Sequence, residues 1–241
     1  KHWAGFPSEA IRFCLEDAGI TLDQVDHIAI GRDLKAKMLK KIMFAASHPA
    51  IGLKAISNRL LNARQVNSLA KEFAIHFPGV QEDSIYSRIH HVEHHRAHLA
   101  SAFYASPFPE AALLSIDGSG DFTTTMMGVG RGTTMEVLDS IDFPHSIGVF
   151  YSAFTQYLGF PHYGDEYKVM GLAPYGKPLY IDKLRDIVHL KNDGTFRLNL
   201  SYFNVTRGNV ISYGEDHIPV VDRLYSQKLA SSFGPERKKG E

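Results

Sequence analysis

The sequence is poor in cysteine and has no excess of charge. Among its 241 residues there is one cysteine, Cys14, so no disulfide can form within the chain. Such a composition is typical of a reducing compartment. Lys and Arg together number 26, as do Asp and Glu, which leaves a formal net charge of zero. Because phosphate-backbone binding favours a basic surface, this balance argues against nucleic acid as a partner. We therefore expect a cytoplasmic protein.

Long apolar runs are also missing. No stretch approaches the roughly 20 apolar residues that a membrane-spanning helix requires, so we expect no membrane partner. The chain starts at Lys1 without an initiator methionine and without the apolar core of a signal peptide. We expect a piece of a larger protein, whose 44% of hydrophobic residues is ordinary for a globular chain.

Apolar spacing and turn residues predict an α/β fold. Helices are expected from Pro7 to Gly19, over 33–46 and 57–76, and from Gly148 to Leu158. Strands are expected over 26–31, 85–92, 111–116, 122–129 and 135–141, of which the last three form a meander. Cys14 lies in the first predicted helix, where we expect it to be a core thiol.

Histidine is concentrated in one place, because five of the thirteen histidines lie within the nine residues 90–98. On a helix, residues four apart share a face, so His94 and His98 can direct two imidazoles at one metal ion. His90 with His94, and His91 with His95, have the same spacing, and a polar helix start with ordinary hydrogen bonds is the alternative. Two imidazoles do not complete a site, so we expect a third ligand, a carboxylate, from elsewhere.

A glycine-rich stretch with a carboxylate at each end follows at Asp117-Gly118-Ser119-Gly120-Asp121. We expect it to be a turn between two strands. Glycine amides can approach phosphate oxygens closely because no Cβ intervenes, and Asp117 could hold a metal-bound water or position a substrate hydroxyl. The alternative is a plain β-turn.

The stretch 164–178 places acidic residues, a lysine and glycines around a short predicted helix. A carboxylate such as Glu166 could bind ribose hydroxyls. Lys168 lies beside it, and Gly171 and Gly176 would let a nucleotide lie against the backbone. The alternative is a capped helix that ends at Pro174.

Taken together and in this order, these stretches resemble the carbamoyltransferase family of nodulation protein U and the antibiotic O-carbamoyltransferases. The matching segments are 1–11, 94–103, 117–121, 146–148, 151–153 and 165–176. The resemblance covers most of 1–178, whereas 179–241 matches weakly apart from Phe233-Gly234-Pro235.

The resemblance implies an actin-like ATPase fold, of which this chain would be an incomplete N-terminal part. It also implies a reaction in which carbamoyl phosphate and ATP give carbamoyladenylate, and the carbamoyl group then moves to a hydroxyl of a small-molecule acceptor. The implied metal ligands are His94 and His98, with an aspartate beyond Glu241 as the third. The implied metal is iron, with zinc as the alternative.

By the same resemblance, the phosphate contacts fall on 117–121. The nucleotide contacts fall around Glu166, within one position, and around Lys168, Gly171 and Gly176. The family also has a hairpin upstream of Lys1 and a C-terminal domain that forms carbamoyladenylate, so we expect the chain alone to be inactive. The alternatives are an ATP-dependent kinase or hydrolase of the same fold, or a non-catalytic module that binds nucleotide or metal.

Overall fold

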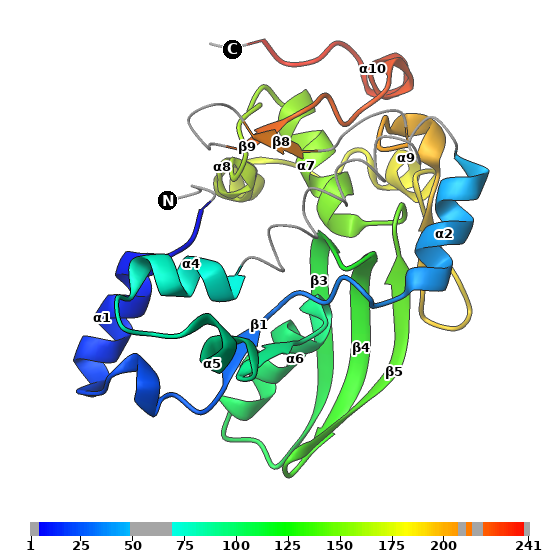
Figure 1. Ribbon diagram of the computed structural model, residues 1–241. Coiled ribbons are helices and arrows are strands. Elements are labelled where there is room, and N and C mark those ends of the chain that lie inside the picture. The colour runs from blue at the N-terminus through cyan, green and yellow to red at the C-terminus, as the bar shows by residue number, and fades with distance from the viewer. Residues whose placement is uncertain (1–4, 49–68, 207–210, 214–218, 239–241) are drawn as a thin grey trace. The chain divides into compact units, whose positions relative to one another are not determined.

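The computed structural model describes residues 5–48, 69–206, 211–213 and 219–238 (Figure 1). The chain divides into two compact units, and the boundary lies between Glu93 and His94. The α/β class predicted from the sequence is confirmed, because helices and strands occur in both units.

The first unit is mainly helical around one short parallel strand pair. Its elements are α1 (Ser8–Ala18), η1 (Leu22–Gln24), β1 (Ile28–Ile30), α2 (Met38–Ser47), α4 (Leu69–His76), α5 (Glu82–Tyr86) and β2 (Ile89–His91). Strand β1 pairs with β2 in parallel, with Ile28 opposite Ile89. The core of the unit forms around Phe73 and Ile85. Helix α1 ends where predicted, because Gly19 adopts the left-handed conformation that closes a helix.

Two helix predictions change in this unit. Helix α2 begins at Met38 rather than at 33, because the Asp33 carboxylate accepts a hydrogen bond from the Lys35 N–H and holds a local turn there. The second prediction, over 57–76, lies partly outside the described residues, and α4 accounts for 69–76.

The predicted strand over 85–92 is wrong in its first half. Glu82 and Asp83 occupy the first turn of α5, where their charges favour the helix N-terminus. Ile85 is fully buried from this helix, so its apolar character reflects the core and not a strand. Strand β2 is left with residues 89–91.

The prediction for Cys14 is also wrong, because its thiol is exposed. Helix α1 packs through Ile11 and Leu15 against the core of the first unit. Cys14 lies beside that stripe, on the part of the helix that faces outward. The sequence did not determine which side of the helix faces the core, because apolar residues occur around it.

The second unit contains a three-stranded antiparallel meander and the remaining helices. Its larger elements are α6 (His94–Tyr104), β3 (Glu110–Gly120), β4 (Thr123–Arg131), β5 (Thr134–Asp142) and α7 (Ile147–Tyr157). Smaller elements follow: α8 (Glu166–Leu172), η2 (Ala173–Tyr175), α9 (Ile181–Arg185), β6 (Val188–Leu190), β7 (Phe196–Leu198), η3 (Leu200–Tyr202), β8 (Ile211–Tyr213), β9 (Pro219–Val221) and α10 (Gln227–Phe233). The predicted meander and the predicted helix from Gly148 to Leu158 are confirmed.

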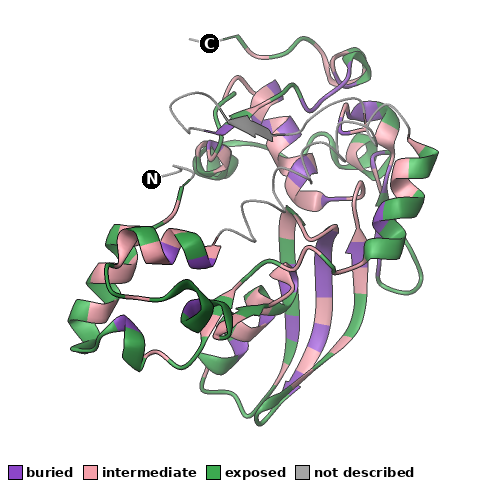
Figure 2. Cartoon of the chain, viewed as in Figure 1, coloured by how far each residue is buried: buried purple, intermediate pink, exposed green. Residues whose placement is uncertain are grey.

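Helix α6 covers one face of the meander, whereas α7 packs at the end of β3. Helix α6 packs through Leu99 and Phe103 onto Met126 and its neighbours. Helix α7 packs onto Ile141, which pairs with Thr125, the residue adjacent to Met126. Successive strand residues point to opposite faces, so the two helices contact different faces, but large apolar side chains of β3 stay exposed on the face away from α6. Figure 2 shows the burial that results along β4.

The glycine-rich stretch is not the turn that the sequence predicts. Residues 117–120 extend β3, and the register shifts between Ile116 and Gly120. The reversal occurs at Asp121 and Phe122, whose φ angles are 50° and 80°. Two positive φ angles in a two-residue connection are typical of the type I′ turn that matches the twist of a tight hairpin. The glycines therefore serve as strand residues, and the next two residues turn the chain.

Helix length also bears on the membrane question. The longest helices described, α1, α6 and α7, have 11 residues each. Within the described parts of the chain, no helix combines the length and the apolar character needed to cross a membrane.

Candidate metal centre

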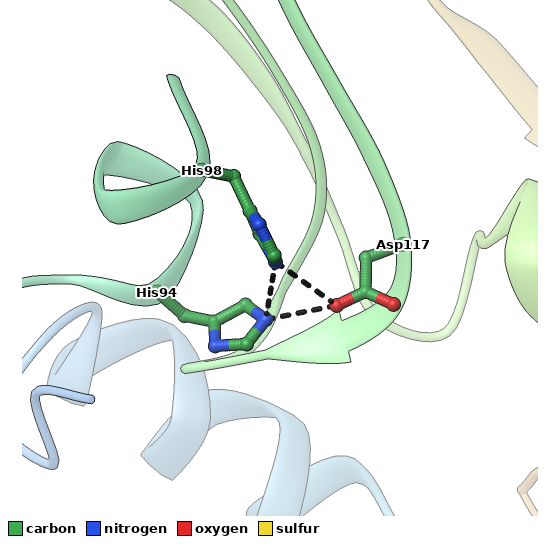
Figure 3. A group of neighbouring side chains, drawn as sticks. All are labelled: His94, His98 and Asp117. Carbon is green, nitrogen blue, oxygen red and sulfur yellow. Dashed lines mark hydrogen bonds and ion pairs between the residues drawn. The ribbon is translucent and has the colours of Figure 1, made fainter. Parts of the chain in front are cut away.

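Three side chains of the second unit converge at the end of β3 (Figure 3). Atom Nε2 of His94 lies 2.8 Å from Oδ2 of Asp117, and Nε2 of His98 lies 3.6 Å from the same oxygen. The two Nε2 atoms are 3.0 Å apart. One ligand atom from each residue lies within 4.8 Å of the others. Among the described residues, these three form the group of His, Cys, Asp or Glu side chains that could hold a metal ion.

Simple local geometry brings the three together. His94 opens α6 and His98 lies one turn later, so both imidazoles leave the same side of the helix. Asp117 lies near the end of β3, against which α6 packs. The side chains are 31%, 50% and 41% exposed, respectively, so solution can reach the cluster.

The carboxylate of Asp117 is held in its charged form. The hydrogen bond with His94 lowers its pKa well below the ordinary value, and this effect outweighs partial burial, which acts in the opposite direction. The backbone N–H of Gly118 also donates to Oδ1 at 2.6 Å. One carboxylate oxygen is therefore held by the strand, while the other faces the two imidazoles.

Two imidazoles and one carboxylate form a donor set suited to a divalent ion. Zinc and non-haem iron(II) both use this combination, and three protein ligands leave coordination positions for substrate or water. The structure also distinguishes among the histidine pairs that sequence spacing allows. His90 and His91 belong to β2 of the first unit, and His95 is turned into the protein interior, so His94 and His98 are the pair that meets the carboxylate.

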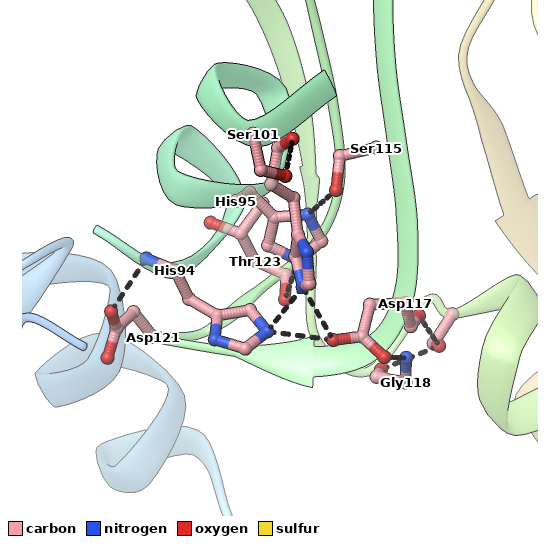
Figure 4. Close-up of polar contacts among 10 residues, drawn as sticks. His94, His95, Ser101, Ser115, Asp117, Gly118, Asp121 and Thr123 are labelled. Atoms are coloured by element: carbon pink, nitrogen blue, oxygen red, sulfur yellow. Dashed lines mark hydrogen bonds and ion pairs between the residues drawn. The ribbon is translucent and has the colours of Figure 1, made fainter. Parts of the chain in front are cut away.

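The hairpin turn supports the first ligand. Oδ2 of Asp121 accepts a hydrogen bond from the His94 backbone N–H at 3.0 Å, which satisfies a donor at the start of α6 (Figure 4). The ring of His94 lies directly over Gly120, so closely that a Cβ at this glycine would overlap the ring atoms. In contrast, a Cβ at Gly118 would meet no atom within 4 Å, and Ser119 is exposed.

The start of α7 supports the strand that carries the carboxylate. Ser146 caps this helix by accepting a hydrogen bond from the Val149 N–H at 3.0 Å. Its hydroxyl lies 2.7 Å from the carbonyl oxygen of Gly118, to which it donates. A Cβ at Gly148 would lie 2.6 Å from backbone atoms of Asp117, so only glycine permits this contact.

The stretch 164–178 forms a separate group. Glu166 accepts a hydrogen bond from the Ser152 hydroxyl of α7 at 2.5 Å. Lys168 forms an ion pair with Asp165 at 2.6 Å. Burial would raise the pKa of Asp165, but the bonds from Lys168 and from the His162 N–H hold it below its ordinary value. Gly171 and Gly176 are exposed. None of these residues joins the cluster of His94, His98 and Asp117.

The predicted short helix is present here as α8, and η2 follows it with Pro174 in its first turn. Helix α8 packs against α7. Gly148 and Ser152 are four residues apart on α7 and so share a face of it, at a spacing of about 6 Å along the axis. One face of α7 therefore contacts both Asp117 and Glu166.

The family described as Carbamoyltransferase N-terminus matches residues 1–218. The chain belongs to this family. The uncharacterized protein sll1178 of Synechocystis sp. is 37% identical to this chain over 246 residues, which cover 100% of the chain and 38% of that protein.

Two relatives are nodulation proteins. NolNO of Sinorhizobium fredii is 37% identical over 209 residues, or 86% of the chain and 29% of that protein. NolO of Bradyrhizobium diazoefficiens is 42% identical over 110 residues, or 45% of the chain and 20% of that protein. The chain thus spans less than two fifths of the length of these relatives.

Sequence reasoning missed several supporting residues of the site. It assigned Asp117 to phosphate, to a metal-bound water or to a substrate hydroxyl, whereas the structure places its carboxylate beside the imidazoles. It gave no role to Ser146 or Gly148, and it considered His95 only as an alternative metal ligand paired with His91. The only available signals were the length of the histidine run and the Ser146-Ile147-Gly148 segment within the resemblance. The third ligand expected beyond Glu241 stays a prediction.

Proposed function

We propose that this chain is the metal-binding part of an O-carbamoyltransferase with an actin-like ATPase fold. The observation that carries the proposal is the convergence of His94, His98 and Asp117 within 4.8 Å. Membership of the carbamoyltransferase family supports the reaction class. In this proposal, the donor is carbamoyladenylate made from carbamoyl phosphate and ATP, and the acceptor is a hydroxyl of a small molecule.

In this proposal some residues bind the metal, and others leave space for the phosphate of the carbamoyl donor. A divalent ion, iron or zinc, would supply Lewis acidity to the carbamoyl carbonyl or to the leaving phosphate. His94 and His98 would hold this ion through ring nitrogens, and Asp117 would contribute the negative charge that offsets part of the ionic charge. Gly118 leaves open space beside Asp117, and Ser119 is exposed there, so a phosphate group can approach the backbone.

The stretch 164–178 is assigned to the nucleotide. Glu166 is bonded to Ser152 on the face of α7 that also contacts Asp117, so a nucleotide held there lies near the metal ligands. Lys168 and the exposed backbone at Gly171 and Gly176 offer a charge and an accessible surface. An ATP-dependent kinase of the same fold would leave the paired imidazoles without a role.

The test is metal binding by variants of the full chain. Titration with Co²⁺, which reports ligand geometry through its absorption, should show one site in the wild type. His98→Ala and Asp117→Ala should each weaken binding by about 10-fold or more. His91→Ala is the control, because this exposed imidazole belongs to the same histidine run but bonds the Arg32 carbonyl. Equal Co²⁺ affinity in wild type and His98→Ala would contradict the proposal.

A further inference from the structure

A fully buried histidine lies between the two ligands of the proposed metal site. His95 has no exposed surface, whereas His94 and His98 on either side of it in the sequence are 31% and 50% exposed. A polar ring removed from water costs free energy unless its nitrogens are hydrogen-bonded. The contacts of His95 therefore indicate what it does.

Both ring nitrogens of His95 are bonded to the sheet (Figure 4). Nε2 lies 3.0 Å from the carbonyl oxygen of Thr123, which can only accept, so Nε2 carries the proton. Nδ1 lies 2.8 Å from Oγ of Ser115, which can donate its hydroxyl proton to it. Ser115 is on β3 and Thr123 is on β4, so one imidazole connects α6 to two neighbouring strands.

These two strand residues flank the site in the chain. Ser115 precedes Asp117 by two positions, so both side chains project from the same face of β3. Thr123 follows the turn whose Asp121 carboxylate binds the His94 N–H. His95 is therefore hydrogen-bonded to the two strand segments that lie next to Asp117 and Asp121.

Because the three histidines lie on one helix, the hydrogen bonds of His95 also restrict the directions in which His94 and His98 point. At about 100° per residue, His94 and His98 point within about 40° of each other, and His95 points about 80° from their mean direction. When His95 is anchored to the sheet, α6 can neither rotate about its axis nor slide along β3 without breaking both bonds. Metal sites tolerate displacements of only about 0.5 Å in their ligands.

We propose that His95 is a positioning residue that sets the direction of His94 and His98 toward Asp117. This inference rests on the proposed metal site. The imidazole suits the role because it offers a donor and an acceptor on opposite sides of one rigid ring. An apolar residue of similar size would fill the space but leave the Ser115 hydroxyl and the Thr123 carbonyl without this partner.

The experiment compares Co²⁺ affinity, Co²⁺ absorption and thermal unfolding in four variants of the full chain. His95→Leu removes both bonds, and we expect about 10-fold weaker binding with an altered spectrum. Ser115→Ala removes one hydrogen bond and should weaken binding about 3-fold. In the double variant, the loss should be smaller than the product of the single losses, because the two residues share one contact. Ser106→Ala, just beyond the C-terminal end of α6, removes a hydroxyl bonded to the Phe103 carbonyl and should bind as wild type.

The outcomes separate the two levels of the proposal. A folded His95→Leu protein that unfolds at lower temperature but keeps the wild-type Co²⁺ affinity and spectrum would show a merely structural histidine and overturn the inference. If His95→Leu does not fold, Ser115→Ala decides by the same criterion. Binding that is insensitive to His98→Ala would instead contradict the metal site itself, and the role of His95 with it.

Discussion

The segments 117–121 and 164–176 carry the same kinds of residues, carboxylates beside glycines, but they are held differently. The carboxylates of Asp117 and Asp121 bond to His94, which is 23 and 27 residues away. Asp165 bonds instead to residues three positions before and after it. The distant contacts of Asp117 and Asp121 bring several elements together, whereas the local contacts of Asp165 stabilise one helix end, and Glu166 links that segment to α7. Only the first arrangement gathers potential metal ligands.

The strongest test of this contrast lies between two glycines of one segment. Gly120→Ala should destabilise the protein by about 1–3 kcal/mol, because its methyl group overlaps the His94 ring. The displaced imidazole should also weaken Co²⁺ binding by about 10-fold or more. Chemical denaturation and Co²⁺ titration measure the two effects.

Gly118→Ala is the matched control for that change. Its Cβ meets open space and its φ is not positive, so its stability should stay within about 0.5 kcal/mol of wild type. Equal effects at the two glycines would remove the basis for distinguishing a packed from an open position. If a phosphate group binds at Gly118, this variant should keep its stability but lose affinity for carbamoyl phosphate or ATP.

The second test concerns the support of the carboxylate. Ser146→Ala removes the cap of α7 and the bond to the Gly118 carbonyl, and it should cost about 1–2 kcal/mol of stability. We expect weaker Co²⁺ binding as well. Ser226→Ala is the matched control, because Ser226 caps α10 and donates to the Ser201 carbonyl in the same manner. A similar stability loss without any change in Co²⁺ affinity is expected there.

A smaller effect is expected from Asp165→Asn, which tests the locally held segment. The folded-state pKa of Asp165 is depressed, so its stabilisation is present above about pH 4, the pKa of an unfolded aspartate. It is lost as the pH falls through the lower folded-state value. Wild type should therefore exceed the variant in stability near neutral pH and lose this advantage in acid, with Co²⁺ affinity equal throughout.

Asp182→Asn is the matched control for that prediction. Asp182 forms an ion pair with Arg185 at the same spacing, but its side chain is 95% exposed. Such pairs contribute little, so no pH-dependent difference from wild type should appear in urea unfolding. A change in Co²⁺ affinity caused by Asp165→Asn would show that segment 164–176 is coupled to segment 117–121 and that the two are not held independently.

The smallest effect is expected at Gly171, which lies within α8 with no atom near its Cβ position. Gly171→Ala should stabilise the protein by about 0.5–1 kcal/mol, because alanine loses less backbone entropy in a helix. If a nucleotide lies against this backbone, ATP affinity measured by calorimetry should fall although stability rises. Unchanged ATP affinity would argue against Gly171 as a nucleotide contact.

Local patterns were sufficient to predict much of this fold. The meander follows from alternating apolar residues, α7 follows from its apolar stripe, and the partnership of His94 and His98 follows from their spacing of four. The errors occur where tertiary contacts decide. Ile85 is apolar because it fills a core, which suits a helix as well as a strand. Gly120 marks a close approach of an imidazole, yet the same residue type is common in turns.

The candidate site was predicted only in part for the same reason. Spacing favours two imidazoles on one face, but it does not reveal that α6 lies against the end of β3. The carboxylate of Asp117 therefore could not be paired with His94 and His98 from the residues alone. The buried bonds of His95 with Ser115 and Thr123 were equally out of reach, since each joins elements whose packing has no local signature.

The cap of α6 has a consequence for the order of assembly. The carboxylate that bonds the His94 N–H belongs to Asp121, which is 27 residues later in the chain. An isolated helix of 11 residues is marginal in water without such support. During synthesis, we therefore expect α6 to remain frayed until the β3–β4 hairpin has emerged and closed. Helix α6, which bears the imidazoles, and strand β3, which bears the carboxylate, then become ordered in a single cooperative event. An incomplete set of metal ligands would therefore not be available to bind ions during synthesis.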